Sequence, residues 1–141
     1  MLTHVTPQGQ PTMVAVGEKA VTARSAWAQA RLRVPASLGE RLANGELQTA
    51  KGPVFATAII AGTMGCKRTS DLIPFCHPIA LEDCKLAVAM ADATTIVIDC
   101  RVATHHKTGV EMEALTGASI AALTVYDMCK ALSHDLVIEQ V

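Results

Sequence analysis

The chain has 141 residues, a length that suits one domain with one substantial hydrophobic core. Its net charge of −1 and its 3% aromatic content disfavour a nucleic-acid-binding protein, which needs basic surface and stacking side chains. No apolar run approaches the roughly 18 residues of a membrane-spanning helix, so we expect no membrane association. Half of the residues are apolar, more than a small domain can bury, and we therefore expect a homo-oligomer.

The first 20 residues are polar and rich in proline and glycine, and they predict a flexible N-terminal arm (residues 1–20) ahead of a single domain over residues 21–141. The arm lacks the charged start and apolar stretch of a signal peptide, so we expect a cytoplasmic protein. The five cysteines are odd in number and form no Cys-x-x-Cys pair, which disfavours a disulfide framework. No second pair matches Cys76-His77 or His105-His106, and we expect no metal site.

Small or aliphatic residues alternate with polar ones over residues 25–34, which predicts a strand with one buried face. The strand should end at Pro35. Ser37 and Glu40 have the spacing of a capping box, and they predict a short helix that ends at about residues 44–45.

A second helix is predicted to begin at Gly52-Pro53, with the proline at its first position, and to run to about Cys66. Residues 84–91 and 95–103 are rich in aliphatic residues and flank a turn-forming triplet. These two segments predict a β-hairpin.

Thr108 and Glu111 form another capping-box pattern, which predicts a helix from residue 109 to about residue 132. This helix is apolar on nearly all sides, so we expect it to lie between a sheet and another layer. Residues 135–141 predict a last strand. The order β-α-α-β-β-α-β, with one extra short helix, indicates an α+β fold of the ferredoxin-like split βαβ type: an antiparallel sheet with helices packed on one face.

Residues 61–81 combine glycines with cations, as phosphate-binding loops do, but their spacing excludes a P-loop. Only two residues separate the glycines, a cysteine intervenes before Lys67, and a helix rather than a strand precedes them. Lys67 is instead expected at the end of the helix, where a cation complements the helix dipole. In the turn that follows, prolines restrict the backbone around His77, so this ring is either a rigidly held site residue or a structural histidine.

Five charged residues near helix ends are open to two interpretations. Lys51 precedes a helix N-terminus, where it is either a solvated lysine or a partner of the helix N–H groups in binding a phosphate. Glu111 and Glu113 start an apolar helix as dipole partners or as acid/base groups. Asp127 and Lys130 are spaced i, i+3, so they form an ion pair or, in apolar surroundings, exchange protons near neutral pH.

Two long segments resemble the cyclic pyranopterin monophosphate synthase family, also called molybdenum cofactor biosynthesis protein C. They are residues 51–81, KGPVFATAIIAGTMGCKRTSDLIPFCHPIAL, and residues 107–132, KTGVEMEALTGASIAALTVYDMCKAL. The similarity extends from about Met13 to the end of the sequence. It implies a ferredoxin-like subunit in a homohexamer, a trimer of dimers with active sites between subunits.

The resemblance also implies a reaction. The family rearranges 3′,8-cyclo-7,8-dihydro-GTP, the product of a radical-SAM GTP cyclase, into cyclic pyranopterin monophosphate and releases pyrophosphate. This is a lyase reaction on a small-molecule substrate in molybdenum cofactor biosynthesis. It implies no required cofactor, although Mg²⁺ can accompany the triphosphate.

Matching positions imply roles for individual residues. Three residues would have catalytic roles in proton transfer: Asp127, Lys130 and Lys51. Others would bind substrate as pocket residues or as cations that meet the triphosphate: Cys76, His77, Glu111, Met112, Glu113, Lys67 and Arg24. Such a mixture suits the reaction, because cations neutralise phosphate charge while acids and bases open one ring and close another.

The sequence departs from the family pattern at two places. Ala15 stands where the family commonly has Asp, and the sequence stops at Val141, where the family usually continues with a tail rich in Lys, Gly and Ser. The alternative hypothesis is a non-catalytic ferredoxin-like module that binds a nucleotide or a pterin.

Overall fold

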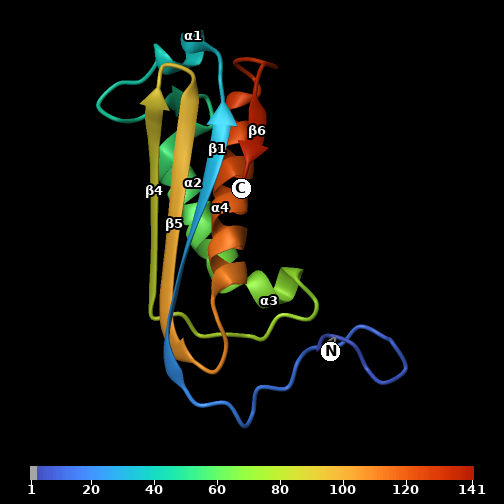
Figure 1. The fold of residues 1–141 in the computed structure, drawn as a ribbon. Coiled ribbons are helices and arrows are strands. Elements are labelled where there is room, and N and C mark those ends of the chain that lie inside the picture. Colours follow the sequence, from blue (N-terminus) through green and yellow to red (C-terminus); the bar gives the residue numbers. More distant parts are fainter. Residues whose placement is uncertain (1–2) are drawn as a thin grey trace.

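The computed structural model describes residues 3–141 and contains a four-stranded antiparallel sheet (Figure 1). The strands lie in the order β4-β5-β1-β6. Their bounds are Thr22–Arg33 for β1, Asp83–Asp92 for β4, Thr95–His106 for β5 and Val137–Gln140 for β6. All three neighbouring pairs are antiparallel. The predicted first strand, hairpin and last strand are therefore confirmed.

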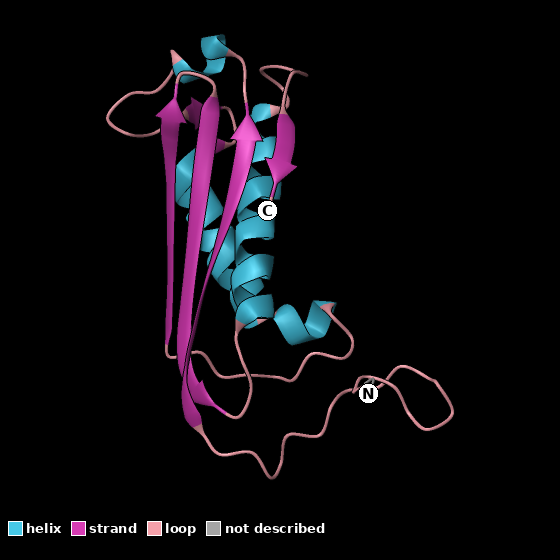
Figure 2. Cartoon of the chain, in the orientation of Figure 1, coloured by secondary structure: helices cyan, strands magenta, loops and turns pink. Residues whose placement is uncertain are grey.

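Two long helices, α2 (Val54–Lys67) and α4 (Glu111–Cys129), lie on one face of the sheet (Figure 2). The shorter elements are α1 (Ala36–Gly39), α3 (Thr69–Leu72), β2 (Gln48–Thr49) and β3 (Gly52–Pro53). The α2 segment connects β1 to β4 past β5, and α4 connects β5 to β6 past β1. Each helical connection thus skips one strand, which is the split βαβ topology and confirms the fold class.

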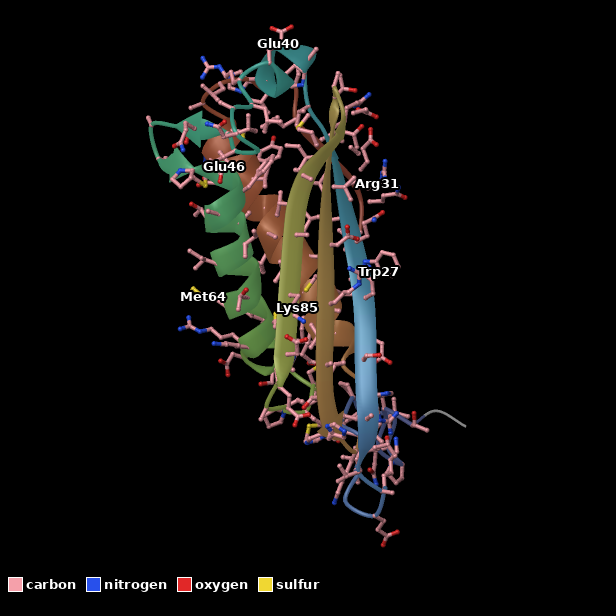
Figure 3. All side chains as sticks on the ribbon, turned by 90° about the vertical axis from the view of Figure 1, so that its left-hand side faces the viewer. Trp27, Arg31, Glu40, Glu46, Met64 and Lys85 are labelled. Carbon is pink, nitrogen blue, oxygen red and sulfur yellow. The ribbon has the colours of Figure 1, made fainter. Side chains whose placement is uncertain are left out.

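The core lies between the sheet and the two long helices. Every second residue of the central strands points toward the helices and is buried, as the alternation in the sequence predicts. These core residues include Ala28, Ala30, Leu32, Ile96, Ile98, Cys100 and Val102. Trp27 and Arg31 point from the opposite face of the sheet (Figure 3).

Glycines allow α2 and α4 to cross with their backbones in contact. A Cβ atom on Gly62 of α2 would lie 2.9 Å from the carbonyl oxygen of Gly117 in α4 and would overlap Leu86. One turn further along α2, a Cβ atom on Gly65 would lie 2.9 Å from Cγ1 of Ile120. Distances below 3.0 Å leave no room for a side chain, so glycine at these positions permits this helix packing.

Both predicted capping boxes are wrong. The N-cap of α1 is Pro35, whose carbonyl accepts a hydrogen bond from Leu38 N at 2.9 Å, so Ser37 lies inside the helix. The helix also ends early, at Gly39, because Asn44 (φ 52°) and Gly45 (φ 74°) form a tight turn instead of a helix end. Two consecutive residues with positive φ are typical of the Asn-Gly hairpin turn.

The second long helix, α4, begins at Glu111 with Val110 as its N-cap, two residues later than predicted, and ends at Cys129 rather than near residue 132. No side chain caps its start, and the Glu111 carboxylate lies against Gly109. The α2 prediction is close, although Pro53 is the N-cap rather than the first helical residue. The short helix α3 was not predicted from the sequence.

Among the described residues, none of the helices combines the length and the apolar character needed to cross a membrane.

We predict that Gly62→Ala lowers the free energy of unfolding by about 1–3 kcal/mol, because the new methyl group overpacks the helix crossing. Alanine favours the helix by about 1 kcal/mol relative to glycine, and the overpacking should cost more than this gain. Gly17→Ala is the matched control, since no atom lies within 4 Å of a Cβ at that position. Equal denaturation midpoints for the two variants would contradict a packing role for Gly62.

Candidate active site

Three charged side chains meet where α2 begins and α4 ends. Lys51 Nζ lies 2.8 Å from Oδ2 of Asp127, and Lys130 Nζ lies 2.9 Å from Oδ1 of the same carboxylate. The structure thus brings together the three predicted catalytic residues, two of them from positions 76 residues apart in the sequence. It also confirms the i, i+3 contact between Asp127 and Lys130.

A tight turn between β2 and β3 presents Lys51. Its backbone N–H donates to Oγ1 of Thr49 at 3.2 Å, and the Thr49 hydroxyl donates to the carbonyl of Gly52 at 3.2 Å. Gly52 has φ 111°, a conformation that a residue with a side chain rarely adopts. Local hydrogen bonds and one glycine therefore hold the lysine backbone in place.

Glu46 anchors this turn to the start of α2. Its carboxylate accepts hydrogen bonds from the backbone N–H groups of Leu47 (2.7 Å), Phe55 (2.7 Å) and Ala56 (3.0 Å). Burial raises the pKa of Glu46, but these hydrogen bonds outweigh burial and hold the pKa below its usual range. A carboxylate from outside the helix thus satisfies N–H groups that no residue of α2 caps.

Hydrogen bonds in the lysine–aspartate cluster favour the charged forms of Asp127 and Lys130. Hydrogen bonds from Lys51 and then from Lys130 lower the pKa of Asp127 to about 2. The hydrogen bond to Asp127 raises the pKa of Lys130 above its usual value. The Asp127 and Lys130 side chains are 52% and 57% exposed, so the chain by itself does not supply the apolar surroundings that the proton-exchange interpretation requires. Proton exchange at neutral pH therefore needs a change in these surroundings.

A cavity of about 460 Å³ lies at the opposite end of α4. The N-terminal arm, the segment after α3 and the start of α4 line it. It brings together four of the predicted substrate-binding residues: Cys76, His77, Glu111 and Met112.

The arm holds the ring of His77. Its Nε2 lies 2.5 Å from the carbonyl oxygen of Val14 and must donate to it, which leaves Nδ1 as the acceptor nitrogen of the neutral ring. Val14 and Val16 both line the cavity, whereas Ala15 between them is exposed. Successive side chains of an extended segment point in opposite directions, so the residue at position 15 points away from this cavity.

Glu113, another predicted substrate-binding residue, is buried and is not among the residues that line the cavity. It is only 3% exposed, and burial, with a smaller contribution from the charge of Glu111, raises its pKa. Burial and the charge of Glu113 also raise the pKa of Cys76. A half-buried thiol with a raised pKa is not an activated nucleophile, and a buried carboxyl with a raised pKa suits proton transfer near neutral pH.

Two predicted phosphate contacts, Lys67 and Arg24, do not line this cavity. Lys67 is exposed in the last turn of α2, where the sequence predicted a cation at a helix end. Arg24 lies at the start of β1, and its Nη2 donates to the carbonyl of Lys107 at 3.5 Å. Within residues 3–141, the buried Nε of Arg24 has no hydrogen-bond partner.

Helix α4 separates the two groups of site residues. From Glu113 to Asp127 the helix rises by about 21 Å, at about 1.5 Å per residue. The cluster around Asp127 and the cavity around His77 therefore lie too far apart in one chain for a single substrate of nucleotide size to contact all the residues of both. The chain by itself therefore contains two partial sites: the lysine–aspartate cluster and the histidine cavity.

Comparison with known proteins identifies the family. A sequence model of the MoaC family matches residues 13–141. The chain belongs to the MoaC family. The cyclic pyranopterin monophosphate synthase of Xanthomonas axonopodis pv. citri (strain 306) is 56% identical over 135 residues, which cover 96% of this chain and 82% of that protein.

MoaC-family sequence also occurs within longer proteins. Molybdenum cofactor biosynthesis protein 1 of Dictyostelium discoideum is 49% identical to the chain, and the match covers 97% of the chain but 24% of that protein. The molybdenum cofactor biosynthesis bifunctional protein of Synechocystis sp. (strain ATCC 27184 / PCC 6803 / Kazusa) is 46% identical to the chain. That match covers 99% of the chain and 41% of the bifunctional protein.

Sequence reasoning missed several residues of this MoaC-family site. Glu46 was missed because its partners Phe55 and Ala56 lie 9 and 10 residues later, beyond the spacing of any capping motif. Lys19 lines the cavity from the arm, a segment without periodicity. Its positive charge was the only signal that could have been used.

We predict that Lys51→Ala raises the pKa of Asp127 from about 2 toward the ordinary value near 3.9. Because the folded-state pKa is depressed, pairing stabilises the fold above about pH 4 and this stabilisation disappears as the pH falls toward 2. Carboxyl-carbon NMR titration measures the shift. Lys85→Ala, which removes a lysine paired with Asp83 instead, should leave Asp127 unchanged.

We predict that Glu46→Gln lowers the free energy of unfolding by about 1–2 kcal/mol, as loss of a helix cap does. It should also raise the pKa of Asp127, because the turn that holds Lys51 loses its anchor. The side chain of Glu40 makes no hydrogen bond within residues 3–141, so Glu40→Gln is the control (Figure 3). A destabilised Glu46→Gln with an unchanged Asp127 pKa would show that Glu46 supports the helix but does not position Lys51.

Proposed function

We propose that the chain is a cyclic pyranopterin monophosphate synthase, a lyase that converts 3′,8-cyclo-7,8-dihydro-GTP to cyclic pyranopterin monophosphate and pyrophosphate. The observation that carries this proposal is 56% identity to a synthase of that name over nearly the whole chain, with the lysine–aspartate cluster assembled. Its place is molybdenum cofactor biosynthesis, and its substrate comes from a radical-SAM GTP cyclase. We propose the cytoplasm as its location.

We propose that two copies of the chain complete each site, with the lysine–aspartate cluster from one copy and the histidine cavity from another. The separation of about 21 Å along α4 supports this arrangement. So do apolar side chains on the outer helix faces, where Ile60 is 62% and Leu123 55% exposed. Met64 projects from the same side of α2 (Figure 3). The proposed assembly is a homohexamer, a trimer of dimers.

In this assembly the residues divide the chemistry. Lys51 and Lys130, held beside Asp127, neutralise phosphate or developing oxyanion charge, and Lys130 gives a proton to the substrate. Glu113, with its raised pKa, exchanges protons with the purine-derived ring, which His77 and Glu111 orient. Lys67 and Arg24 contribute charge toward the triphosphate. No cofactor is required, and Mg²⁺ can accompany the phosphates.

The alternative is a binding module for a nucleotide or pterin without catalysis. The names of the relatives do not favour it, because the similar proteins are called synthases or biosynthesis proteins. The Lys51–Asp127–Lys130 contacts also exceed what simple binding of an anion requires, since an anion-binding site gains nothing from a carboxylate at its centre.

The direct test is turnover. When freshly prepared 3′,8-cyclo-7,8-dihydro-GTP is added, the purified chain should release pyrophosphate and an oxidisable pterin in equal amounts. A pyrophosphate assay measures the first product, and fluorescence of the oxidised pterin measures the second. Lys51→Ala and Lys130→Ala should lower turnover by about 10²–10⁴-fold while the protein stays folded. Lys85→Ala is the control. Substrate binding without either product would favour the binding module.

Mixing two inactive variants tests the shared site. Lys51→Ala and His77→Ala should each be inactive, and mixed oligomers made by co-expression should regain about a quarter of wild-type turnover, since a quarter of the interfaces then receive two intact halves. If one chain supplied both residues, every site in the mixture would carry a defect and no activity would return.

A further inference from the structure

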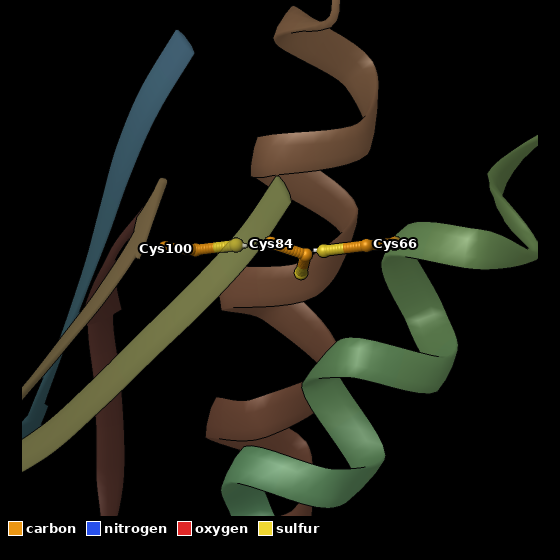
Figure 4. Close-up of side chains that lie close together, drawn as sticks. All are labelled: Cys66, Cys84 and Cys100. Atoms are coloured by element: carbon orange, nitrogen blue, oxygen red, sulfur yellow. Dashed lines mark hydrogen bonds between the residues drawn. The ribbon is translucent and has the colours of Figure 1, made fainter. Parts of the chain in front are cut away.

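Three cysteine thiols converge in the core, beside Gly117 of α4. Cys66 comes from α2, Cys84 from β4 and Cys100 from β5 (Figure 4). Their three Sγ atoms lie within 4.8 Å of one another, and those of Cys66 and Cys100 are 3.5 Å apart. This trithiol cluster takes no part in the proposed reaction.

The fold builds this cluster from three elements, and a fourth packs directly against it. Cys84 and Cys100 lie on neighbouring strands and pair with Val102 and Leu86 respectively, so both point toward the helices. Gly117 of α4 closes the site: a Cβ there would overlap Cys66 Sγ and lie 2.7 Å from Cys100 Sγ. Glycine at position 117 thus allows the α4 backbone to pack directly against the sulfurs.

The spacing of the sulfurs suits one ion bound to all three. With metal–sulfur bonds of about 2.3 Å, sulfurs in a three-coordinate complex lie at most about 4.0 Å apart. The Cys66–Cys100 separation of 3.5 Å already meets this limit. The other separations, none above 4.8 Å, need to close by about 1 Å or less to reach it. Cys84 can supply that movement because β4 is an edge strand.

Charge selects the ion. Cys66 and Cys100 are fully buried among apolar residues, and an uncompensated charge there is costly. Three thiolates leave a net charge of about −2 with a monovalent ion and −1 with a divalent one, but zero with a trivalent one. We propose that the trithiol cluster is a binding site for a trivalent thiophilic ion of the arsenic(III) type, held by Cys66, Cys84 and Cys100 as a neutral complex.

The binding step balances without an oxidant or a reductant. Arsenous acid, As(OH)₃, reacts with three thiols to form three As–S bonds, and each hydroxide leaves with a thiol proton as water. Burial raises the pKa of Cys84 to about 12, and a hydrogen bond to Cys100 together with burial raises that of Cys66. The raised pKa values favour the protonated thiols of Cys66 and Cys84, the form that this exchange uses. The half-buried Cys84 reacts first, and α2 must move transiently to admit the ion to the two buried sulfurs.

The test uses the reduced full-length chain and arsenite under anaerobic conditions. We expect one arsenic atom per chain by native mass spectrometry, with the loss of three protons, and three sulfur neighbours by X-ray absorption at the arsenic edge. Bound arsenic should also raise the midpoint of thermal unfolding, because it binds the folded chain. Cys84→Ala should weaken arsenite binding by about 100-fold or more. Losing a residue that only hydrogen-bonds to a metal ligand already costs up to about 100-fold in affinity, and losing a ligand itself should cost at least as much.

Two variants separate loss of a ligand from loss of the fold. Cys129→Ala removes another buried cysteine outside the cluster and should bind arsenite as the wild type does. Cys84→Val, with a strand-favouring residue of similar size, covers the case in which Cys84→Ala fails to fold. Arsenic with fewer than three sulfur neighbours, or equal binding by Cys84→Val and the wild type, would overturn the proposal. Displacement of arsenite by equimolar Zn²⁺ or Cu⁺ would overturn the charge argument. None of these readouts depends on turnover, so failure here leaves the proposed synthase activity untouched.

Discussion

The backbone contact between α2 and α4 determines how the site residues at the ends of these two helices come together. Gly62 and Gly117 allow the helices to approach until a Cβ on one would lie 2.9 Å from a carbonyl of the other. Because α2 and α4 are antiparallel across this contact, the start of α2 meets the end of α4. Lys51, just ahead of α2, therefore reaches Asp127. At the other end, the segment after α2 returns beside the start of α4 and forms the histidine cavity.

This arrangement gives the two partial sites different electrostatics. At the exposed lysine–aspartate cluster, charged hydrogen bonds push the pKa of Asp127 down to about 2 and that of Lys130 up. In the first turn of α4, burial raises the pKa of Glu113. One region therefore provides fixed charge and the other provides a carboxyl that titrates closer to neutral pH. A reaction that releases pyrophosphate and rearranges rings needs both kinds of group.

The chain holds its site residues in position by short-range means at each end. Glu46 and Gly52 fix the turn of Lys51, and the carbonyl of Val14 fixes the tautomer of His77. The long apolar helix α4 lies between them. It sets the distance between the two groups of residues and places no charged side chain between them. In the proposed assembly, partial sites that are already formed would limit the ordering entropy lost at the interface.

The sequence by itself determined the strands, the two long helices and their order, because alternating burial and apolar helices leave periodic patterns that local reasoning detects. It also placed Asp127 beside Lys130, since i, i+3 neighbours share a helix face. The tertiary structure alone decided that Lys51 joins them from 76 residues away, that Glu46 caps a helix nine residues downstream, and that three cysteines without any common motif converge. These contacts depend on how closely two helices and a sheet pack, and that distance is set by side-chain volumes across the core rather than by any spacing along the chain.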